Sequence, residues 1–394
     1  MSLHPVVGHR DERASLAAAH ERHVLPAALL LHGPRGVGKQ RLALWLAQLL
    51  VCDAPSDSAG DASGTAPCGS CPSCRMVLGL EHPDVHWYFP LARPKGATGD
   101  KLVDALEQAR LEEIAEMREQ PLRPSHSEDV RGLYLGTVKS IRSRAHKRPV
   151  MAAGPIFIVG EAERLVPQES SPEAANALLK LLEEPPGGGR FILTSNEPGR
   201  LLPTIRSRAV PLHLGPLDRG EVSEFLESAT DVSADKAVWA AALSQGSPGR
   251  ALGFLPVAGE RGPLDRLRRR AYELVTAALS PGTAAGYGVA LGFPPAGARG
   301  LVDLFEFVEE WVRDLAAVAS GASACILNHD AASELEKRVR EARIAPFSAA
   351  DAFAAVERAR ELAWANVNPQ LVVSGLVRDL RSTLRGGAPE GVPA

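Results

Sequence analysis

The sequence predicts an α/β protein with a parallel sheet and a phosphate-binding loop, followed by segments that are entirely helical. Short apolar runs alternate with helical patterns over the first 215 residues, which is typical of a parallel sheet covered by helices. A glycine-rich segment, GPRGVGK at 33–39, lies between a predicted strand and a predicted helix. After about residue 216 the strand signal disappears and only helical periodicity remains.

The strands are expected where apolar residues run continuously, because both faces of a parallel sheet are buried. These runs are AALLLHG (27–33), DVHWYF (84–89), GPIFIVG (154–160), RFILTSN (190–196) and AVPLHL (209–214). The segment KQRLALWLAQLLV (39–51) is expected to form the helix after the glycine-rich loop.

A further helix is indicated within SSPEAANALLKLLEEPP. Ser171 can cap it, Pro172 suits its first turn, and Pro185-Pro186 stop it. Its apolar face consists of Leu178, Leu179 and Leu182.

The chain divides by pattern into an α/β domain (1–215), a small helical domain (216–260), a second helical domain (262–386) and a frayed tail (387–394). Within the first, residues 53–67 are a polar loop of low complexity, and residues 91–136 are an insertion. The periodicity and many charges of 100–120 favour an exposed helix or helical pair. In the second helical domain, 300–319 is the clearest helix.

The composition is that of a soluble protein and argues against one that clamps DNA by itself. The 394 residues are 45% hydrophobic and 23% charged with a net charge of -3, whereas DNA-clamping domains are strongly basic. The first residues lack the apolar core of a signal peptide. The longest apolar run (42–51) is about half as long as a membrane span. We therefore expect a cytoplasmic protein.

The glycine-rich loop has the residue types that hold nucleotide phosphates. Glycines let backbone amides converge on a phosphate, a lysine adds charge, and the helix N-terminus adds its dipole. The nucleotide-binding candidates are Gly33, Pro34, Gly36, Val37, Gly38, Lys39 and Gln40.

Two magnesium contacts of P-loop ATPases are missing from this pattern. Magnesium takes a Ser or Thr hydroxyl at the position of Gln40, and a carboxylate at the end of a second buried strand, where Gly160 stands. Gln40 alone is tolerable, since its amide oxygen can reach a cation. The paired loss predicts inefficient hydrolysis of Mg-ATP, with Glu161 an ordinary exposed carboxylate instead of a base that activates water.

Four of the five cysteines lie in the first 74 residues, three of them at two-residue spacing. The candidate metal ligands are Cys52, Cys68, Cys71 and Cys74. Four thiolates favour a structural zinc ion that ties down the polar loop, with free thiols as an alternative. An iron–sulfur cluster is disfavoured, because Leu78 stands where a further cysteine would follow. Cys325, alone in an apolar stretch, is expected to be packed.

Three basic features each have two interpretations. Arg206 and Arg208 in TIRSRAVPL are either a solvated pair or a source of an arginine finger, which stabilises the transition-state charge on a neighbouring subunit's γ-phosphate. The basic run 139–148 is either a solvated helix face or a contact to DNA or a partner. Arg250 in GSPGRAL is either a nucleotide sensor or a surface residue of a helix.

Taken in order, these motifs resemble bacterial clamp-loader subunits of the AAA+ class. The similar segments are VVGHRDERASL, LPAALLLHGPRGVGK, the four-cysteine module, ANALLKLLEEPP, FILTSNEP, LLPTIRSRA and GSPGRAL. They cover roughly residues 4–90 and 137–255, and the insertion 91–136 lies outside the shared pattern. The resemblance implies an AAA+ domain, a helical lid (216–260) and a helical collar (262–386) that assembles five subunits into an open ring.

The resemblance also implies roles for individual residues. Some subunits of this family hydrolyse ATP, whereas others lack working catalytic residues and act as rigid stators that offer an arginine finger from a Ser-Arg-Cys motif. That motif is Ser207-Arg208-Ala209 here, so Arg208 is the implied finger and Arg206 its competitor. Asn196 falls at the sensor-1 position, and Arg250 lies one residue later than the sensor-2 arginine. The four cysteines carry over as zinc ligands.

The implied function is that of a non-hydrolysing subunit that supports ATP-dependent loading of a sliding clamp onto primed DNA. The implied partners are ATPase subunits called gamma or tau, a delta subunit joined through the collar, and, through the complex, the clamp and the DNA. Zinc is the implied cofactor, and any ATP that binds the glycine-rich loop is not expected to be hydrolysed. Two rival hypotheses are an active ATPase like gamma or tau, and an unrelated P-loop protein whose cysteine knuckle binds nucleic acid. The net charge of -3 and the 5% of aromatic residues argue against the second rival.

Overall fold

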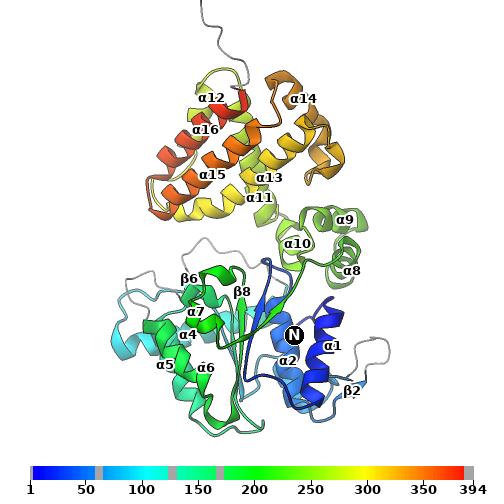
Figure 1. Ribbon diagram of the computed structural model, residues 1–394, viewed down its shortest axis with the longest axis vertical. Coiled ribbons are helices and arrows are strands. Elements are labelled where there is room, and N and C mark those ends of the chain that lie inside the picture. Colours follow the sequence, from blue (N-terminus) through cyan, green and yellow to red (C-terminus); the bar gives the residue numbers. More distant parts are fainter. Residues whose placement is uncertain (1–2, 58–64, 123–130, 166–172, 386–394) are drawn as a thin grey trace, which may run out of the picture. The chain divides into compact units, whose positions relative to one another are not determined.

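The computed structural model describes residues 3–57, 65–122, 131–165 and 173–385. The chain forms two compact units, Met1–Gly253 and Phe254–Ala394 (Figure 1). The first contains a sheet with helices on both faces and then three more helices, and the second is helical. The predicted tail (387–394) and the predicted helix start at Ser171 and Pro172 lie outside the described residues.

Five strands form one sheet in the order β4-β7-β8-β1-β9 (Figure 1). Their bounds are β1 Ala28–His32, β4 Val85–Tyr88, β7 Ile156–Val159, β8 Arg190–Ser195 and β9 Val210–His213. Every pairing along this order is parallel, which confirms the predicted parallel sheet. The carboxyl ends of the strands therefore meet at one edge, where the glycine-rich loop follows β1.

The central strands are buried on both faces, and alternate side chains enter two different hydrophobic clusters. Leu29 and Leu31 of β1 belong to one cluster, whereas Leu30 belongs to the other. Strand β9 differs from the buried strand that the sequence predicts, because it lies at the sheet edge with a partner on one side only. Its Val210 is 52% exposed.

Helices cover the sheet. Their bounds are α1 Arg10–Glu21, α2 Lys39–Val51, α3 Pro72–Leu78, α4 Gly99–Glu119, α5 Leu135–Ala145, α6 Glu173–Glu183 and α7 Pro203–Arg206. The helix predicted at 39–51 is confirmed at both ends. Gly38 takes a left-handed φ of 106° before it, and Cys52 returns to extended backbone after it. Leu178 and Leu182 of α6 are buried, as predicted.

The polar loop and the insertion contain regular structure that the sequence did not indicate. Antiparallel pairs join β2 Ser56–Asp57 to β3 Thr65–Ala66, and β5 Leu91–Ala92 to β6 Arg131–Gly132. Of the two alternatives expected for residues 100–120, the structure has one long helix, α4. Leu106 and Ile114 of α4 are 3% and 6% exposed. Helix α4, which the sequence predicts to be exposed, therefore buries one face. Leu106 and Ile114 lie eight residues apart on that face, as expected for a helix with one apolar side.

Three helices follow the sheet: α8 Arg219–Ala229, α9 Ala234–Leu243 and α10 Pro248–Phe254. The second unit consists of α11 Pro263–Leu279, α12 Ala284–Leu291, α13 Leu301–Ala319, α14 Ala332–Ala342, α15 Ser348–Trp364 and α16 Pro369–Arg385. Short 3-10 turns are η1 Ala162–Leu165, η2 Pro186–Gly188, η3 Pro198–Arg200, η4 Ala298–Gly300, η5 Ser323–Cys325 and η6 His329–Ala331. Within the described ranges, no helix has both the length and the apolar character that crossing a membrane requires.

Helix α13 is the centre of the second unit and packs against α11 and α15. Its Trp311 donates from Nε1 to the carbonyl of Arg268 at 3.0 Å. The buried Asp314 carboxylate accepts the backbone N–H groups of Leu327 and Asn328, both at 2.8 Å, and so fixes the turn after the helix. Cys325 is exposed, which contradicts the expected packing, because the next residue, Ile326, enters the core in its place.

Candidate nucleotide and metal sites

The glycine-rich loop turns from β1 into α2 in a conformation that requires its glycines. Gly33 and Gly36 have φ values of 150° and 82°, in the region that favours glycine. A Cβ on Gly33 would lie 2.0 Å from the backbone oxygen of Leu214. The loop packs directly against the chain that follows β9, and only glycine fits at that position.

Lys39 is folded into this loop. Its Nζ donates to the carbonyl oxygens of Gly33 at 2.9 Å and Pro34 at 2.6 Å, and the residue is 5% exposed. Burial lowers the pKa of Lys39 to about 8, although Glu163 and Glu161 act in the opposite direction. The chain itself therefore satisfies the ammonium, and a phosphate has to compete with two carbonyl oxygens for it.

Gln40 and Gly160, the two departures from the magnesium-binding pattern, lie in contact. A Cβ on Gly160 would be 3.0 Å from Nε2 of Gln40 and 3.1 Å from its Cδ. Both distances are shorter than ordinary van der Waals contact. The Gln40 amide thus occupies the space that a side chain at position 160 would enter.

Two carboxylates follow Gly160, and they differ in environment. Glu161 has a left-handed φ of 49° and forms an ion pair with Arg164 at 2.7 Å. Glu163 is only 7% exposed, and its Oε1 accepts the backbone N–H of Asn196 at 3.0 Å. Sequence reasoning missed Glu163, which lies in η1, although its place two residues after Glu161 is a usable signal.

Two further segments contact the glycine-rich loop through its backbone. The N–H of Gly249 in α10 donates to the carbonyl of Gly36 at 2.9 Å. A Cβ on Gly36 would lie 3.0 Å from the backbone nitrogen of Arg250. The Nε2 atom of His9, a buried residue, lies 2.7 Å from the carbonyl oxygen of Val37. The GSPGR segment is therefore brought to the loop, and His9 is a contact that the sequence did not reveal.

The four early cysteines come together, with all four sulfur atoms within 4.8 Å of one another. Cys52 directly follows α2, and Cys71 directly precedes α3, where its Sγ accepts the N–H of Cys74 at 3.3 Å. The N–H of Cys71 donates to Sγ of Cys68, also at 3.3 Å. This donor and the N–H of Ser70 lower the pKa of the Cys68 thiol to about 6.

This geometry suits a metal with tetrahedral sulfur ligands. Zinc–sulfur bonds of about 2.3 Å place tetrahedral sulfurs about 3.8 Å apart, and the sulfurs of Cys68 and Cys74 are 3.9 Å apart. Backbone N–H groups directed at sulfur stabilise the thiolate form that binds metal. The cluster can hold a metal ion such as zinc.

Arg206 is the last residue of α7, Arg208 lies two residues beyond it, and the two differ in their contacts. The Arg208 guanidinium forms an ion pair with Glu183 at the end of α6, and its Nη1 donates to the carbonyl of Thr204 at 2.9 Å. Arg206 is exposed and makes no ion pair within the part of the chain that the structure describes. Glu183 lies in the LLEEPP segment, but nothing in the sequence indicated that it pairs with Arg208.

The basic run 139–148 lies mostly on α5, and part of its charge is neutralised within the chain. Arg144 pairs with Glu107 of α4 at 2.5 Å, and Lys139 approaches Asp100 at 4.0 Å. Arg142 is exposed.

A family model described as "DNA polymerase III, delta subunit" matches residues 9–218. The DNA polymerase III subunit delta' of Pseudomonas aeruginosa is 34% identical over 224 residues, which are 56% of this chain and 53% of that protein. The subunit gamma/tau of Mycobacterium tuberculosis is 31% identical over 207 residues, which are 52% of this chain and 27% of that protein. The chain therefore spans about half the length of the first relative, and less of the second.

Among solved structures, a gamma subunit-related protein of DNA polymerase III from Thermotoga maritima aligns with 94% of this chain and 99% of its own, at 16% identity and a TM-score of 0.38. The family model matches more than half of the chain and spans the glycine-rich loop, the four cysteines and Arg208. This protein therefore belongs to the DNA polymerase III delta subunit family, and it is similar to the delta' subunits.

Proposed function

We propose that this chain is a non-hydrolysing subunit of the bacterial DNA polymerase III clamp loader, a delta'-type stator that supports ATP-dependent loading of the sliding clamp onto primed DNA. The observation that carries this function is the contact between Gln40 and Gly160. Magnesium bound in the usual way needs a hydroxyl at the first position and a carboxylate from the second strand. Neither group is present, and the Gln40 amide occupies the space between these two positions.

Arg208 is the residue that acts on ATP, in trans, on the neighbouring ATPase subunit. Its ion pair with Glu183 leaves the Arg208 side chain 33% exposed. Surface pairs of this kind contribute only about 0–1 kcal/mol. The more highly charged γ-phosphate of a neighbour can therefore draw Arg208 away from Glu183. Arg206 is the competing candidate for this role.

The remaining parts have supporting roles. Residues 1–215 form the AAA+ domain, residues 216–260 the lid, and residues 262–386 the collar that joins gamma or tau and delta subunits. Cys52, Cys68, Cys71 and Cys74 hold a structural zinc ion. The glycine-rich loop and Asn196 are the degenerate nucleotide site of this subunit, and ATP bound there is not hydrolysed. The complex acts in the cytoplasm.

The test of the arginine finger is DNA-stimulated ATP hydrolysis by the reconstituted clamp loader with its clamp and primed DNA. Arg208→Ala is expected to abolish the stimulated turnover, while gel filtration still shows the assembled complex. Arg206→Ala is the matched control, because it removes the same charge two residues away. Unchanged turnover in Arg208→Ala excludes the finger, and loss only in Arg206→Ala transfers the role to that residue.

Nucleotide binding by the isolated chain tests the stator assignment. Titration with ATP, with and without magnesium, is expected to give the same affinity in both conditions, and no phosphate release. Magnesium-dependent tightening accompanied by hydrolysis contradicts the assignment.

The second candidate is an active ATPase subunit of the gamma/tau type. It is favoured by the complete set of glycines with Lys39 and by the gamma/tau relative. Hydrolysis of Mg-ATP by the isolated chain, lost in Lys39→Ala, would establish it.

A further inference from the structure

The side chain of Glu163, in η1, is a buried carboxylate at the edge of the nucleotide site. The residue is 7% exposed. Its Oε1 accepts the N–H of Asn196 at 3.0 Å, whereas its Oε2 has no hydrogen-bond partner within the described residues. A buried charge is screened by salt and water much less than an exposed one. Glu163 therefore acts on other charged groups over a longer range than a surface carboxylate does.

A single peptide group joins this carboxylate to the glycine-rich loop. The carbonyl of Ser195 accepts the N–H of Gly33 at 3.3 Å. The N–H of the same peptide group, which belongs to Asn196, donates to Glu163. Oε1 of Glu163 therefore lies at most about 9 Å from the backbone nitrogen of Gly33. The Gly33 carbonyl in turn accepts from Nζ of Lys39 at 2.9 Å. The carboxylate and the ammonium are thus both held at the first residue of the loop.

The two carboxylates near Lys39 differ in whether another side chain balances their charge. Glu161 forms an ion pair with Arg164 at 2.7 Å, whereas Glu163 forms no ion pair with any residue that the structure describes. Burial lowers the pKa of Lys39, and Glu163 opposes this effect more strongly than Glu161 does. Arg35 acts in the same direction as burial. Glu163 is therefore the unpaired negative charge that stabilises the Lys39 ammonium.

A phosphate that enters the loop has to compete with this arrangement. Lysine is the side chain that brings positive charge to such a loop, and the Lys39 ammonium is already bound by two carbonyl oxygens and attracted by a carboxylate. The charge of Glu163 stays close to the loop, because the hydrogen bond from Asn196 and the burial of the side chain hold it there. The repulsion between Glu163 and a bound phosphate grows with the charge that the phosphate carries.

We propose that Glu163 is a specificity-determining residue of the glycine-rich loop, an internal anion that weakens the binding of phosphates and penalises a nucleoside triphosphate more than a diphosphate. The triphosphate has the greater charge. In P-loop sites its outermost phosphate is the one that magnesium links to the end of the second strand, and η1 follows that strand end here. The inference rests on the proposed function, in which the nucleotide site is retained without hydrolysis. It assigns the weakening to a charge that is present, in addition to the two magnesium contacts that are missing.

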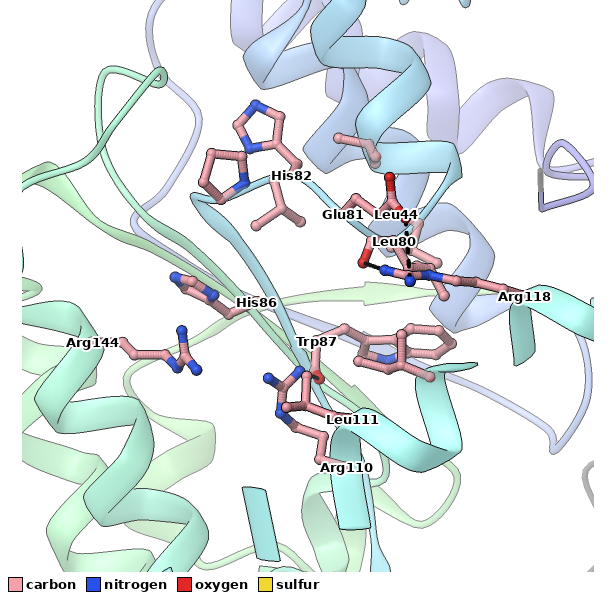
Figure 2. A pocket seen from close by; sticks show the side chains of 14 residues that line it. Leu44, Leu80, Glu81, His82, His86, Trp87, Arg110, Leu111, Arg118 and Arg144 are labelled. Atoms are coloured by element: carbon pink, nitrogen blue, oxygen red, sulfur yellow. Dashed lines mark hydrogen bonds and ion pairs between the residues drawn. The ribbon is translucent and has the colours of Figure 1, made fainter. Parts of the chain in front are cut away.

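The pocket of about 330 Å³ between α4 and β4 is the competing location for a bound nucleotide (Figure 2). None of the residues that line it belongs to the glycine-rich loop or to η1. Lys39→Ala removes the ammonium of the loop and leaves this pocket intact, so it decides between the two locations. Nucleotide affinity that survives Lys39→Ala in the Glu163→Gln background overturns the proposal.

Calorimetric titration of the full chain with ATP and with ADP, in buffer without added divalent metal, measures the effect of the charge. Glu163→Gln keeps the acceptor for the Asn196 N–H and removes the charge. It is expected to tighten ATP binding by about tenfold and ADP binding by about threefold. Glu163→Asp keeps the charge, but its shorter side chain gives up the hydrogen bond to Asn196, and it is expected to give no gain. An equal gain for the two nucleotides, no gain in Glu163→Gln, or a gain in Glu163→Asp overturns the proposal.

Glu161→Gln is the matched control, because Arg164 balances the charge of Glu161. It is expected to tighten ATP binding by less than about threefold. Equal gains in Glu161→Gln and Glu163→Gln would show that Glu163 has no special role.

The pH dependence of ATP affinity separates the charge of Glu163 from its shape. Lys39 interacts with Glu163 and Glu161 of the η1 segment, with Arg35 of the loop and with His32 of β1. Glu163→Gln removes a charge that raises the pKa of Lys39, so its alkaline loss of ATP affinity is expected at lower pH than in wild type. Glu163→Asp is expected to keep the wild-type midpoint. The same midpoint in wild type and Glu163→Gln overturns the proposal.

Assay of phosphate release in the same samples separates this inference from the proposed function. Tighter ATP binding with phosphate release in Glu163→Gln would contradict the non-hydrolysing role and still support the internal anion. Unchanged affinity without phosphate release would remove the internal anion and leave the non-hydrolysing role standing.

Discussion

The Nε2 atom of Gln40 lies 3.0 Å from the position that a Cβ on Gly160 would occupy. The phosphate loop and the second strand of the site are thus fitted to each other by these two residues. Gly160→Asp is expected to lower the free energy of unfolding by about 1–3 kcal/mol, because its Cβ overpacks against the Gln40 amide. Urea unfolding at neutral pH measures the change.

A double-mutant cycle identifies the cause of that loss. Gln40→Ser removes the amide, so Gly160→Asp in that background is expected to recover at least about 1 kcal/mol. Gly199→Asp is the matched control, since a Cβ at Gly199 has nothing within 4 Å. Strictly additive effects of Gln40→Ser and Gly160→Asp would show that the contact is not the cause.

The ion pair between Arg208 and Glu183 predicts an effect opposite to that of removing the arginine. Glu183→Gln releases Arg208 without changing the shape of its partner, so the DNA-stimulated ATPase of the reconstituted complex is expected to rise by about two- to fivefold, in line with the strength of a surface pair. Glu184→Gln, next along the chain, is expected to change nothing. A fall in turnover in Glu183→Gln would mean that Glu183 positions Arg208 for the reaction and does not hold it back.

The cysteine cluster predicts one zinc ion per purified chain, measured by elemental mass spectrometry. Cys71→Ser is expected to lose the metal and several kcal/mol of unfolding free energy, because binding a structural zinc is coupled to folding. Cys325→Ser is the control, since Cys325 is exposed and lies outside the cluster. Iron in place of zinc, or equal zinc content in the two variants, contradicts the assignment.

His86 predicts a dependence of stability on pH. Burial and the Arg144 and Arg110 guanidiniums lower the pKa of His86 to about 4 from 6.5. Between pH 6.5 and pH 4 the His86 side chain takes up a proton in the unfolded chain but not in the folded chain. This protonation favours the unfolded chain, so the contribution of His86 to the free energy of unfolding is complete above pH 6.5 and is lost as the pH falls toward 4. Its full size is roughly 3 kcal/mol.

Urea unfolding at several pH values in this range tests this effect. Wild type is expected to lose more free energy of unfolding than His86→Gln does on the same acidification. Groups that titrate equally in both proteins make no contribution to the difference between their free energies of unfolding. Parallel curves for the two proteins would exclude His86 as the source.

The regular elements of the sheet could be predicted because their signals are local. An apolar run such as 156–159 is recognisable without any partner, and the helix at 39–51 is bounded by a glycine and a change of polarity. The exposure of Val210 was missed because an edge strand has the same composition as a central one. Cys325 was missed because which residue of an apolar turn enters the core depends on the direction of the turn.

The candidate site was predictable in its residue types but not in its contacts. The glycines, Lys39 and the cysteine spacing can be read along the chain. By contrast, the pairing of Arg208 with Glu183 joins residues 25 positions apart, and the contact of Gln40 with Gly160 joins two different elements. Such relationships depend on how helices and strands pack, and neither residue of such a pair indicates the other in the sequence.

The hydrogen bond from the Gly249 N–H to the Gly36 carbonyl supports the glycine-rich loop at an atom that an anion does not bind. A loop supported in this way is already formed before any nucleotide arrives, and a nucleotide leaving it does not unravel it. In hydrogen–deuterium exchange, the Gly249 amide then belongs with the slowly exchanging core. Its exchange rate would report directly whether a bound nucleotide disturbs α10.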